Sequence, residues 1–326
     1  MERFTNRYFV IKTLSINSPP SSWPWNAPED PIGITSTDAE TLPRLTIVTP
    51  SYNQAAFLEA TLRSVLLQNY PNLEYIVIDG GSTDGSVEII RRYQDRIAYW
   101  VSEPDNGQCH AINKGFSKST GEWMAWLNSD DIYLPGTLWT IARTILSHKD
   151  CNWVVGAVEF ADRDLKPFSI FKPVCRTDVW VDFVCTKRKN GTALPQAGSF
   201  WSRKSWDLAG PLDESLHYAM DHEYWGRLAY HGFRPLCIQQ SLALFRLHTQ
   251  GKTARGDSDF MAEERIVIQK WLGKVTDSDS KILINYQRSF GLRLLLRNMK
   301  HRMNCFLDLL RGVVHRYRNA KIHNAD

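Results

Sequence analysis

Four short apolar runs alternate with helix-forming segments in the first half of this 326-residue chain. They cover residues 44–49, 74–79, 98–102 and 123–127, and a polar or glycine-rich cluster follows each one. This alternation predicts right-handed strand–helix–strand units and a parallel sheet with helices on both faces. Because the carboxyl ends of parallel strands meet at one edge, we expect the clusters to form a single ligand site there. The clusters are residues 51–53, 79–84, 103–107 and 128–131.

The fourth cluster, Asn-Ser-Asp-Asp at 128–131, offers two carboxylates, an amide and a hydroxyl. These are the hard oxygen ligands that Mg²⁺ or Mn²⁺ prefers. The same residues could instead cap a helix, because we expect one to start near Pro135, where proline needs no amide partner. Its place as the fourth strand end in succession favours the ligand site.

Composition narrows the class of protein. A hydrophobic content of 43% is typical of a packed globular fold, and a net charge of +4 argues against a dedicated nucleic-acid-binding protein. The six cysteines are scattered without a Cys-x-x-Cys pair, which argues against a zinc site or a disulfide framework and favours a reducing cytosol. No uninterrupted apolar run approaches the roughly 20 residues of a membrane-spanning helix, and no signal-peptide pattern is present. We therefore expect a cytoplasmic protein.

Both ends of the chain differ from its middle. Residues 1–43 are predicted to be a proline-rich arm, which could lie across the surface of the main domain through Trp23 and Trp25 or could simply be a loose arm. Residues 258–326 are predicted to form a basic helical extension. Leucines lie among arginines at 289–317, which suits an amphipathic helix on an anionic membrane surface. A helical hairpin packed on the domain or on a partner is the alternative.

Six sequence motifs, read together, resemble the family-two glycosyltransferases of the GT-A fold over roughly residues 44–253. The motifs are Pro-Ser-Tyr-Asn at 50–53, Ile-Asp-Gly-Gly-Ser-Thr-Asp-Gly at 78–85, Asn-Lys-Gly at 113–115, Leu-Asn-Ser-Asp-Asp at 127–131, Met-Asp-His-Glu-Tyr-Trp at 220–225 and Arg-Leu-His at 246–248. The resemblance implies a mixed, mainly parallel α/β sheet, with a nucleotide-sugar half at 44–150 and an acceptor half at 151–257. It also implies a nucleotide-sugar donor, most simply a UDP-sugar, and transfer of a hexosyl-type sugar with inversion.

The resemblance assigns a role to each matching residue. Tyr52 and Asp79 would hold the nucleotide base, the 128–130 turn would hold ribose and a divalent Mn²⁺ or Mg²⁺ ion, and Asp221 would be the catalytic base. The full set of residues expected to bind the nucleotide-sugar is Pro50, Tyr52, Asn53, Asp79, Gly107, Lys114, Asn128 and Ser129.

The roles of several residues stay open. Asp130 and His248 are expected to ligate the metal, although an isolated histidine is more often structural. Lys114 could reach a phosphate or be an ordinary surface lysine. Gln196 and Trp201 could line the acceptor pocket, since aromatic faces suit sugar rings, but a core position for Trp201 is equally compatible. Glu223 is the alternative catalytic base.

Two departures from the family pattern raise alternatives. Asn128 stands where the family usually has the first aspartate of an Asp-x-Asp motif, and an amide contributes no charge to a metal. Gly80 stands where a second aspartate is common. A non-catalytic nucleotide-sugar-binding or scaffold protein is therefore one alternative, and a nucleotidyltransferase is the other. The acceptor would be a hydroxyl of a glycan or lipid-linked glycan in polysaccharide, lipopolysaccharide or glycolipid assembly.

Overall fold

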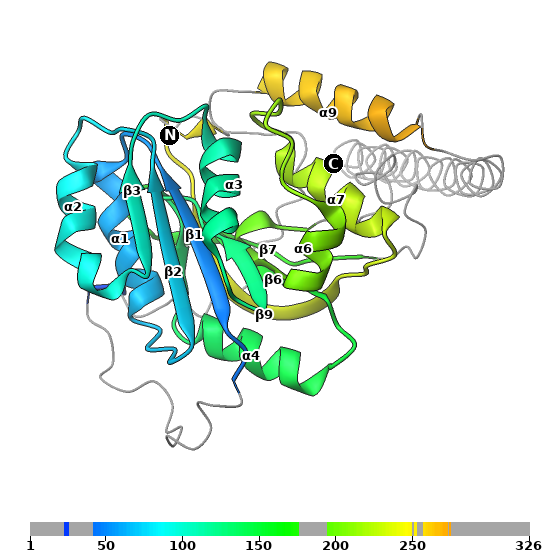
Figure 1. Ribbon diagram of the computed structural model, residues 1–326, viewed down its shortest axis with the longest axis horizontal. Coiled ribbons are helices and arrows are strands. Elements are labelled where there is room, and N and C mark those ends of the chain that lie inside the picture. Colours follow the sequence, from blue (N-terminus) through cyan, green and yellow to red (C-terminus); the bar gives the residue numbers. More distant parts are fainter. Residues whose placement is uncertain are drawn as a thin grey trace, which may run out of the picture. The chain divides into compact units, whose positions relative to one another are not determined.

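The computed structural model describes residues 23–25, 42–175, 194–249, 251–252, 257–272 and 274 (Figure 1). All of these except Lys274 belong to one compact unit that ends at Gly273, and a second unit covers residues 274–326. The predicted amphipathic segment at 289–317 lies outside the described residues, as does most of the N-terminal arm.

One mixed sheet forms the centre of the first unit, in the strand order β3-β2-β1-β4-β8-β6-β9-β5, with β7 paired to β6. The first four strands are mutually parallel, as the strand–helix alternation predicts: β1 (Leu45–Ser51), β2 (Leu73–Asp79), β3 (Tyr99–Ser102) and β4 (Trp123–Trp126). The others are β5 (Ile132–Tyr133), β6 (Trp153–Ala161), β7 (Pro167–Phe171), β8 (Ser199–Ser202) and β9 (Leu236–Arg246). In this second half β6 and β9 pair in parallel, while β4–β8, β6–β8, β6–β7 and β5–β9 are antiparallel.

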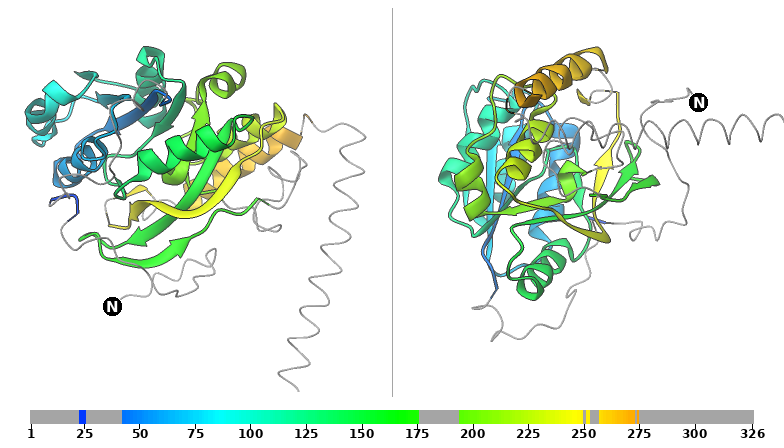
Figure 2. Two further views of the ribbon diagram at one scale, coloured as in Figure 1. Left: turned by 90° about the horizontal axis from the view of Figure 1, so that it is seen from below. Right: turned by 90° about the vertical axis from the view of Figure 1, so that its right-hand side faces the viewer.

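Helices cover both faces of the sheet (Figure 2). One face packs on α1 (Ala55–Leu66), α2 (Ser86–Tyr93) and α4 (Thr137–Ser147). The other face packs on α3 (Gln108–Lys118), α6 (Arg203–Ala209), α7 (Met220–Tyr230) and α9 (Asp257–Leu272). Alternation along β1 explains this arrangement, because Ile47 faces the first group of helices and the next residue, Val48, faces the second. Short 3₁₀ turns occur at Gln94–Arg96 and Gln196–Gly198.

The chain near Pro135 differs from the prediction. A two-residue strand, β5, follows the acidic cluster, and the helix begins only at Thr137, after Gly136 in the left-handed region (φ 77°). Glycine adopts this conformation without steric cost, so it can redirect the chain from the strand into α4.

A buried aromatic cluster lies between the sheet and α7. The ring centroid of Trp201 is 5.3 Å from that of Trp126 and 5.8 Å from that of Trp225. Trp201 is 0% exposed. The prediction that it lines the acceptor pocket is therefore wrong, and its core alternative holds: the indole supplies apolar area and edge-to-face contacts to the core.

Trp23 anchors the described part of the N-terminal arm. Its indole is buried beside Ala60 and Ile132, and Nε1 donates a hydrogen bond to the carbonyl of Tyr133 at 2.8 Å. Arg63 of α1 donates to the carbonyls of two neighbouring arm residues, Pro24 and Trp25. These three arm residues thus lie across the domain surface, as one of the two sequence expectations has it.

Within the described ranges, no helix combines the length and the apolar character that crossing a bilayer requires.

Candidate functional site at the carboxyl edge of the sheet

The parallel strands bring their carboxyl ends into register. Ser51 at the end of β1 pairs with Asp79 at the end of β2, which in turn pairs with Ser102 at the end of β3. Beside them, the backbone N–H of Leu127, just after β4, donates to the carbonyl of Val48 at 2.9 Å. The four polar clusters therefore share one edge of the sheet, as predicted.

Asp79 is buried and organises the turn that follows β2. Its Oδ2 accepts hydrogen bonds from the N–H groups of Gly81 (3.1 Å) and Ser82 (2.8 Å) and from the hydroxyl of Ser102 (2.7 Å). Its Oδ1 accepts from the Ser82 hydroxyl at 2.6 Å. Four accepted bonds use the capacity of a carboxylate. The prediction that Asp79 itself contacts the base is therefore corrected: this side chain holds the turn, and neighbouring groups face outward.

Asp105 explains the glycine at position 80. A Cβ atom on Gly80 would lie 2.8 Å from Oδ2 of Asp105, so a side chain at 80 would collide with this carboxylate. Oδ1 of Asp105 accepts the N–H of Gly107 at 2.8 Å, which fixes the loop before α3. The third strand end thus places a carboxylate beside the position where the family pattern has its second aspartate.

The loop after β1 presents one exposed aromatic ring. Tyr52 is 62% exposed, whereas Pro50 is buried inside β1 and pairs with Ile78. Asn53 takes the left-handed conformation (φ 51°), which asparagine tolerates better than most residues. Its Oδ1 accepts the N–H of Thr83 at 2.9 Å, so the loops after β1 and β2 are tied together.

Lys114 of α3 forms an ion pair with Glu103, at the end of the third strand. This contact favours the alternative that Lys114 is an ordinary surface lysine over the alternative that it contacts a phosphate. Gly107 has a φ of 105°, which only glycine adopts readily, and lies directly before α3.

Asp130 and His248 form a pair in the acidic cluster. Their Oδ2 and Nε2 atoms lie 3.1 Å apart, the Asp130 side chain is 22% exposed and that of His248 is 2% exposed. Donor atoms that each lie about 2.1 Å from one cation at a right angle are about 3 Å apart, so this spacing suits two ligands of one Mn²⁺ or Mg²⁺ ion. Nδ1 of His248 has no hydrogen-bond partner among the residues that the structure describes. No group of three or more His, Cys, Asp or Glu side chains in those residues could hold a metal, so phosphate or water oxygens would have to complete the shell.

Asn128 belongs to a chain of side-chain amides and contributes no free ligand. Its Oδ1 accepts from Nε2 of Gln108 at 2.7 Å, and its Nδ2 donates to Oε1 of Gln196 at 3.2 Å. Gln196 in turn donates to the carbonyl of Trp126 at 2.8 Å, and Lys252 donates to Gln108 at 2.8 Å. Gln196, predicted on the acceptor side, thus contacts the acidic cluster directly.

The other two residues of the cluster face inward. Ser129 is buried, and its carbonyl accepts the hydroxyl of Thr61 at 2.9 Å. Oδ1 of Asp131 accepts the N–H of Arg246 at 2.9 Å. Burial and the charge of Asp130 raise the pKa of Asp131 well above its usual range. The predicted contact of the Ser129 hydroxyl with the donor is therefore not evident in this arrangement.

A buried cation lies beside these carboxylates. The guanidinium of Arg246 stacks on Phe57 of α1, with its carbon atom 4.8 Å from the ring centroid, and the ring of His248 lies 4.3 Å from the same ring. Nε and one terminal nitrogen of Arg246 have no hydrogen-bond partner among the described residues. Two unused donors on a buried cation suit an anion, since a buried polar group is costly until it is paired.

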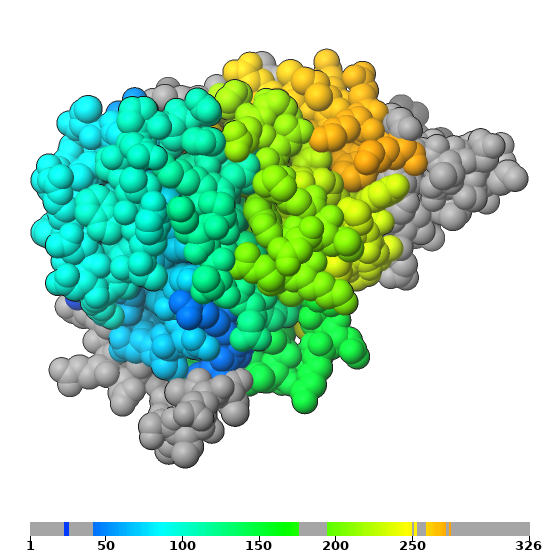
Figure 3. Space-filling view, viewed as in Figure 1, coloured from blue at the N-terminus to red at the C-terminus, as the bar shows by residue number. Residues whose placement is uncertain are grey.

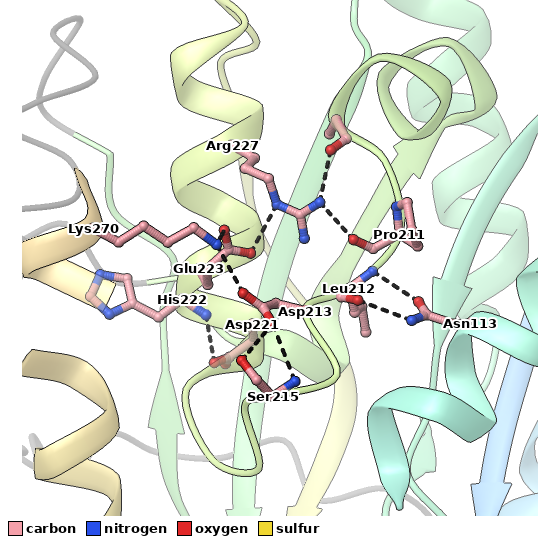
Figure 4. Close-up of polar contacts among 11 residues, drawn as sticks. Asn113, Pro211, Leu212, Asp213, Ser215, Asp221, His222, Glu223, Arg227 and Lys270 are labelled. Atoms are coloured by element: carbon pink, nitrogen blue, oxygen red, sulfur yellow. Dashed lines mark hydrogen bonds and ion pairs between the residues drawn. The ribbon is translucent and has the colours of Figure 1, made fainter. Parts of the chain in front are cut away.

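The start of α7 carries the two acids predicted as alternative bases, and the structure separates them (Figure 4). Glu223 is 0% exposed and forms ion pairs with Arg227 (2.8 Å) and Lys270 (3.1 Å). Asp221 is partly exposed, and its Oδ1 accepts the N–H of His222 at 2.7 Å. Of the two acids, Asp221 alone has a carboxylate within reach of a substrate. The prediction of Glu223 as an acceptor-side residue or base is wrong, because its carboxylate is fully enclosed.

The amino end of α3 joins α7 to the acidic cluster. Gln108 contacts Asn128, and Sγ of the next residue, Cys109, lies 3.0 Å from Sδ of Met220, the first residue of α7. Lys252 links the same two places, because it donates both to Gln108 and to the carbonyl of His217 at 3.1 Å. The helix that carries the predicted base, Asp221, therefore begins at the same edge of the sheet as the predicted metal ligands.

Sequence reasoning missed the residues that hold this edge together, namely Gln108, Asn113, Arg227, Arg246 (as a side chain), Glu263 and Lys270. Most of their partners lie far away in the chain, up to 144 residues in the Lys252–Gln108 contact, so no local pattern reveals them. The exception is Arg227, whose i,i+4 spacing to Glu223 is a local signal. Asn113 was recognised only as part of a motif.

A cavity of about 600 Å³ lies to one side of this edge, between α2 and β3. Ser82 and Ser102, which bond Asp79, contribute to its wall, but none of the predicted site residues lines it. The cavity therefore borders the site at the turn after β2 and at the end of β3, and the acidic cluster does not line it.

Comparison with known proteins agrees with the fold. Residues 46–202 match the model of glycosyl transferase family 2. An uncharacterised glycosyltransferase of Rickettsia typhi is 30% identical over 191 residues, which make up 56% of this chain and 58% of that protein. TuaG of Bacillus subtilis, provisionally named a teichuronic acid biosynthesis glycosyltransferase, is 38% identical over 92 residues, covering 27% of this chain and 36% of TuaG. The crystal structure of S. aureus TarS in complex with UDP-GlcNAc matches with a TM-score of 0.54 at 16% identity, covering 69% of this chain and 65% of that one.

The chain is thus similar to the family 2 glycosyltransferases over residues 46–202, and its fold is the GT-A fold. It spans little more than half the length of the Rickettsia relative.

Proposed function

We propose that this protein is an inverting glycosyltransferase that moves a hexosyl-type sugar from a nucleotide-sugar to a hydroxyl acceptor. The observation that carries the proposal is the contact of the amino end of α3 with both the acidic cluster and the start of α7. This contact brings a candidate metal pair, Asp130 and His248, to the same edge as a partly exposed carboxylate, Asp221. The family to which residues 46–202 belong supports the reaction class.

The donor nucleotide would bind across the ends of β1, β2 and β3. Tyr52 offers an exposed ring for stacking on a base, and Asp105 offers a carboxylate for an N–H group of the base. We favour a UDP-sugar, and TarS, a protein of the same fold, has been crystallised with UDP-GlcNAc.

The diphosphate would lie against the acidic cluster. Asp130 and His248 would hold a divalent Mn²⁺ or Mg²⁺ ion, which when bound supplies Lewis-acid neutralisation of the diphosphate oxygens. Arg246 offers two unpaired donors on the same side and would share the charge of the leaving group.

Asp221 would act as the general base. The acceptor hydroxyl gives its proton to the Asp221 carboxylate while its oxygen forms a bond to the anomeric carbon from the face opposite the leaving group. The bond from that carbon to the diphosphate oxygen breaks, and its electron pair leaves with the nucleoside diphosphate. General-base catalysis of this kind contributes about 10²–10⁴-fold to the rate.

The acceptor would be a glycan or a lipid-linked glycan in polysaccharide, lipopolysaccharide or glycolipid assembly, at the cytoplasmic face of a membrane. Gln196, beside the acidic cluster, would lie on the acceptor side. The basic sequence at 289–317 motivates a peripheral contact with anionic lipid. The name of TuaG, a glycosyltransferase assigned to a wall polymer, is consistent with such an acceptor.

A panel of UDP- and GDP-sugars, each incubated with Mn²⁺ and glycan acceptors, tests the proposal by release of the nucleoside diphosphate. We expect turnover with one donor, loss of turnover in EDTA, and a fall of at least about 10²-fold in Asp221→Asn with donor affinity retained. Donor binding with equal, negligible turnover in wild type and Asp221→Asn, with competent acceptors present, would instead indicate a non-catalytic binding protein.

A further inference from the structure

We propose that α9 positions the catalytic base, with Glu263 as the residue that fixes the start of α7. This inference rests on the proposed function, because it takes Asp221 as the base. Glu263 lies beyond residues 46–202, the segment that matches the family model. Figure 3 shows α9 (orange) lying directly against the neighbouring part of the surface formed by α7.

Glu263 binds the three backbone amides that lead into α7. Its Oε1 accepts the N–H of His217 at 2.8 Å, and its Oε2 accepts those of Tyr218 at 2.6 Å and Ala219 at 2.9 Å. Hydrogen bonds that backbone amides donate to a carboxylate are short and strong, and three of them leave this entry segment little freedom. Asp221 follows two residues after the last of these amides.

The entry segment needs such a partner because α7 lacks a cap of its own. Its N-cap residue is Ala219, which has no side-chain group to accept a helix amide. A negative charge close to a helix amino end is also favoured by the helix dipole. Glu263 supplies a carboxylate from 44 residues further along the chain and binds the amide of this N-cap residue, so α9 holds the point at which α7 begins.

A second contact orients the next turn of α7. Lys270 of α9 forms ion pairs with Glu223 (3.1 Å) and with Asp213 (2.9 Å), while Arg227 holds the other oxygen of Glu223. The full enclosure of Glu223 fixes the rotation of α7 about its axis, and residues two apart on a helix point to different sides. Asp221 thereby lies on a different side of α7 from Glu223 and keeps its partial exposure.

Apolar packing keeps α9 in place. Val267 and Trp271 of α9 are buried in the core cluster that also contains Tyr224 and Leu228 of α7. The ring of Trp271 lies 5.6 Å from that of Tyr230. These contacts hold α9 in a fixed position. Its charged groups are therefore already ordered beside α7, and no conformational entropy is lost in ordering them at each turnover.

α3 holds the loop just before this entry segment. Asn113 donates to the carbonyl of Leu212 at 3.0 Å and accepts its N–H at 2.8 Å (Figure 4), and it also donates to Glu214 at 2.9 Å. The stretch that leads to Asp221 is thus held by a helix of the nucleotide half at residues 212–214 and by α9 at residues 217–219. Within the described part of the chain, the hydrogen bonds of Glu263 are to these backbone amides and not to Asp221, so it acts through the backbone.

The experiment compares Glu263→Ala and Glu263→Gln with two control variants of the same helix, Arg265→Ala and Gln269→Ala. Both control side chains are exposed. Turnover is measured with the nucleotide-sugar found active in the panel, UDP affinity in Mn²⁺ by calorimetry, and exchange of the 217–222 amides by hydrogen–deuterium mass spectrometry. Turnover is expressed per UDP-binding site, so that unfolded protein does not count.

For Glu263→Ala we expect kcat to fall about 10–100-fold, since a displacement of about 1 Å of a catalytic group can cost 10²-fold. The dissociation constant of UDP should stay within twofold of wild type, and amide exchange at 217–222 should rise. Glu263→Gln keeps one acceptor oxygen and should recover part of kcat. The two control variants should match wild type.

A kcat within twofold of wild type in Glu263→Ala, or in Glu263→Gln if the alanine variant does not fold, would overturn the inference. Asp221→Asn separates this result from failure of the proposed function. If Asp221→Asn is inactive and the Glu263 variants are fully active, only the positioning role is wrong. If Asp221→Asn keeps wild-type turnover, the assignment of the base is wrong.

Discussion

Replacing Asn128 by aspartate would restore the usual family motif, yet the structure predicts that it destabilises this protein. Nδ2 of Asn128 donates toward Oε1 of Gln196 at 3.2 Å and toward Oδ2 of Asp131 at 3.4 Å. An aspartate would place an acceptor oxygen against these two acceptors. The carboxylate of Asp131 is buried and cannot turn to water.

The size of the effect follows from this geometry. At an effective dielectric constant of about 20, two unit charges 3.4 Å apart repel by about 5 kcal/mol. Because position 128 is only partly buried, screening reduces the repulsion, and we expect a loss of about 2–3 kcal/mol in the free energy of unfolding at pH 8.

The loss in the free energy of unfolding of Asn128→Asp should grow as the pH rises. Repulsion raises the pKa of the carboxylate pair in the folded state above the unfolded value of about 3.9. The variant should therefore come within about 1 kcal/mol of wild type near pH 4, and its deficit should grow as the pH rises through the raised folded-state pKa toward 8.

Urea unfolding at pH 4.5 and pH 8 in EDTA, followed by tryptophan fluorescence, measures this difference. Asn128→Ala is the matched control, because it removes the same amide without adding a charge. Loss of the hydrogen bond to Asp131 should make its deficit larger at pH 8 than at pH 4.5, but the difference should be smaller than for Asn128→Asp. If Asn128→Asp differs from wild type by the same amount at both pH values, or not at all, the amide is not required as a donor and the reasoning fails.

Three further predictions concern other parts of the molecule. Trp23→Ala should lower the free energy of unfolding in urea by about 3 kcal/mol, because it removes a buried indole. Trp25→Ala, at a residue that is 52% exposed, should change it by less than about 0.5 kcal/mol. Equal effects of the two substitutions would refute the anchoring role of Trp23. Tyr52→Ala should weaken UDP binding about 5–50-fold in calorimetry with an unchanged melting temperature, as expected for loss of base stacking; unchanged affinity would remove Tyr52 from the base site. Although burial raises it, hydrogen bonds from neighbouring hydroxyl, amide and ammonium groups lower the pKa of Asp213 to about 2. The stabilisation that the charged Asp213 carboxylate provides is therefore complete above about pH 4 and is lost as the pH falls toward 2. The free energy of unfolding of Asp213→Asn should depend less on pH in that interval than that of wild type, and an equal pH dependence would contradict the prediction.

The nucleotide half could be predicted well from the sequence because its signals are local. Each strand there is a short apolar run closed by polar residues, and parallel pairing follows from the helices between the runs. The meeting of Ser51, Asp79 and Ser102 at one edge confirms that inference. The mixed α/β sheet flanked by helices is confirmed as well.

The residues that complete the site were beyond the reach of sequence reasoning for a physical reason. Whether Trp201 faces a pocket or the core depends on the packing of α7 over β8. This is a tertiary contact, so a local sequence pattern does not reveal it. The enclosure of Glu223 depends on Lys270, 47 residues later. The spacing of Asp221 and Glu223 predicts that only one of them faces the cleft, but α9 determines which one.

The long pairing of β9 with β6 has a consequence for attempts to dissect this protein. A fragment ending at residue 202, where the family match stops, would lack β9 and leave the inner strand β6 with an open edge from Val154 to Ala161. It would also expose the apolar surface that α7 and α9 cover. Open edges and bared apolar faces are the usual origins of aggregation, so such a fragment should precipitate. We therefore expect the smallest stable fragment to be longer than residues 46–202 and to extend at least through Trp271, which is buried in the core.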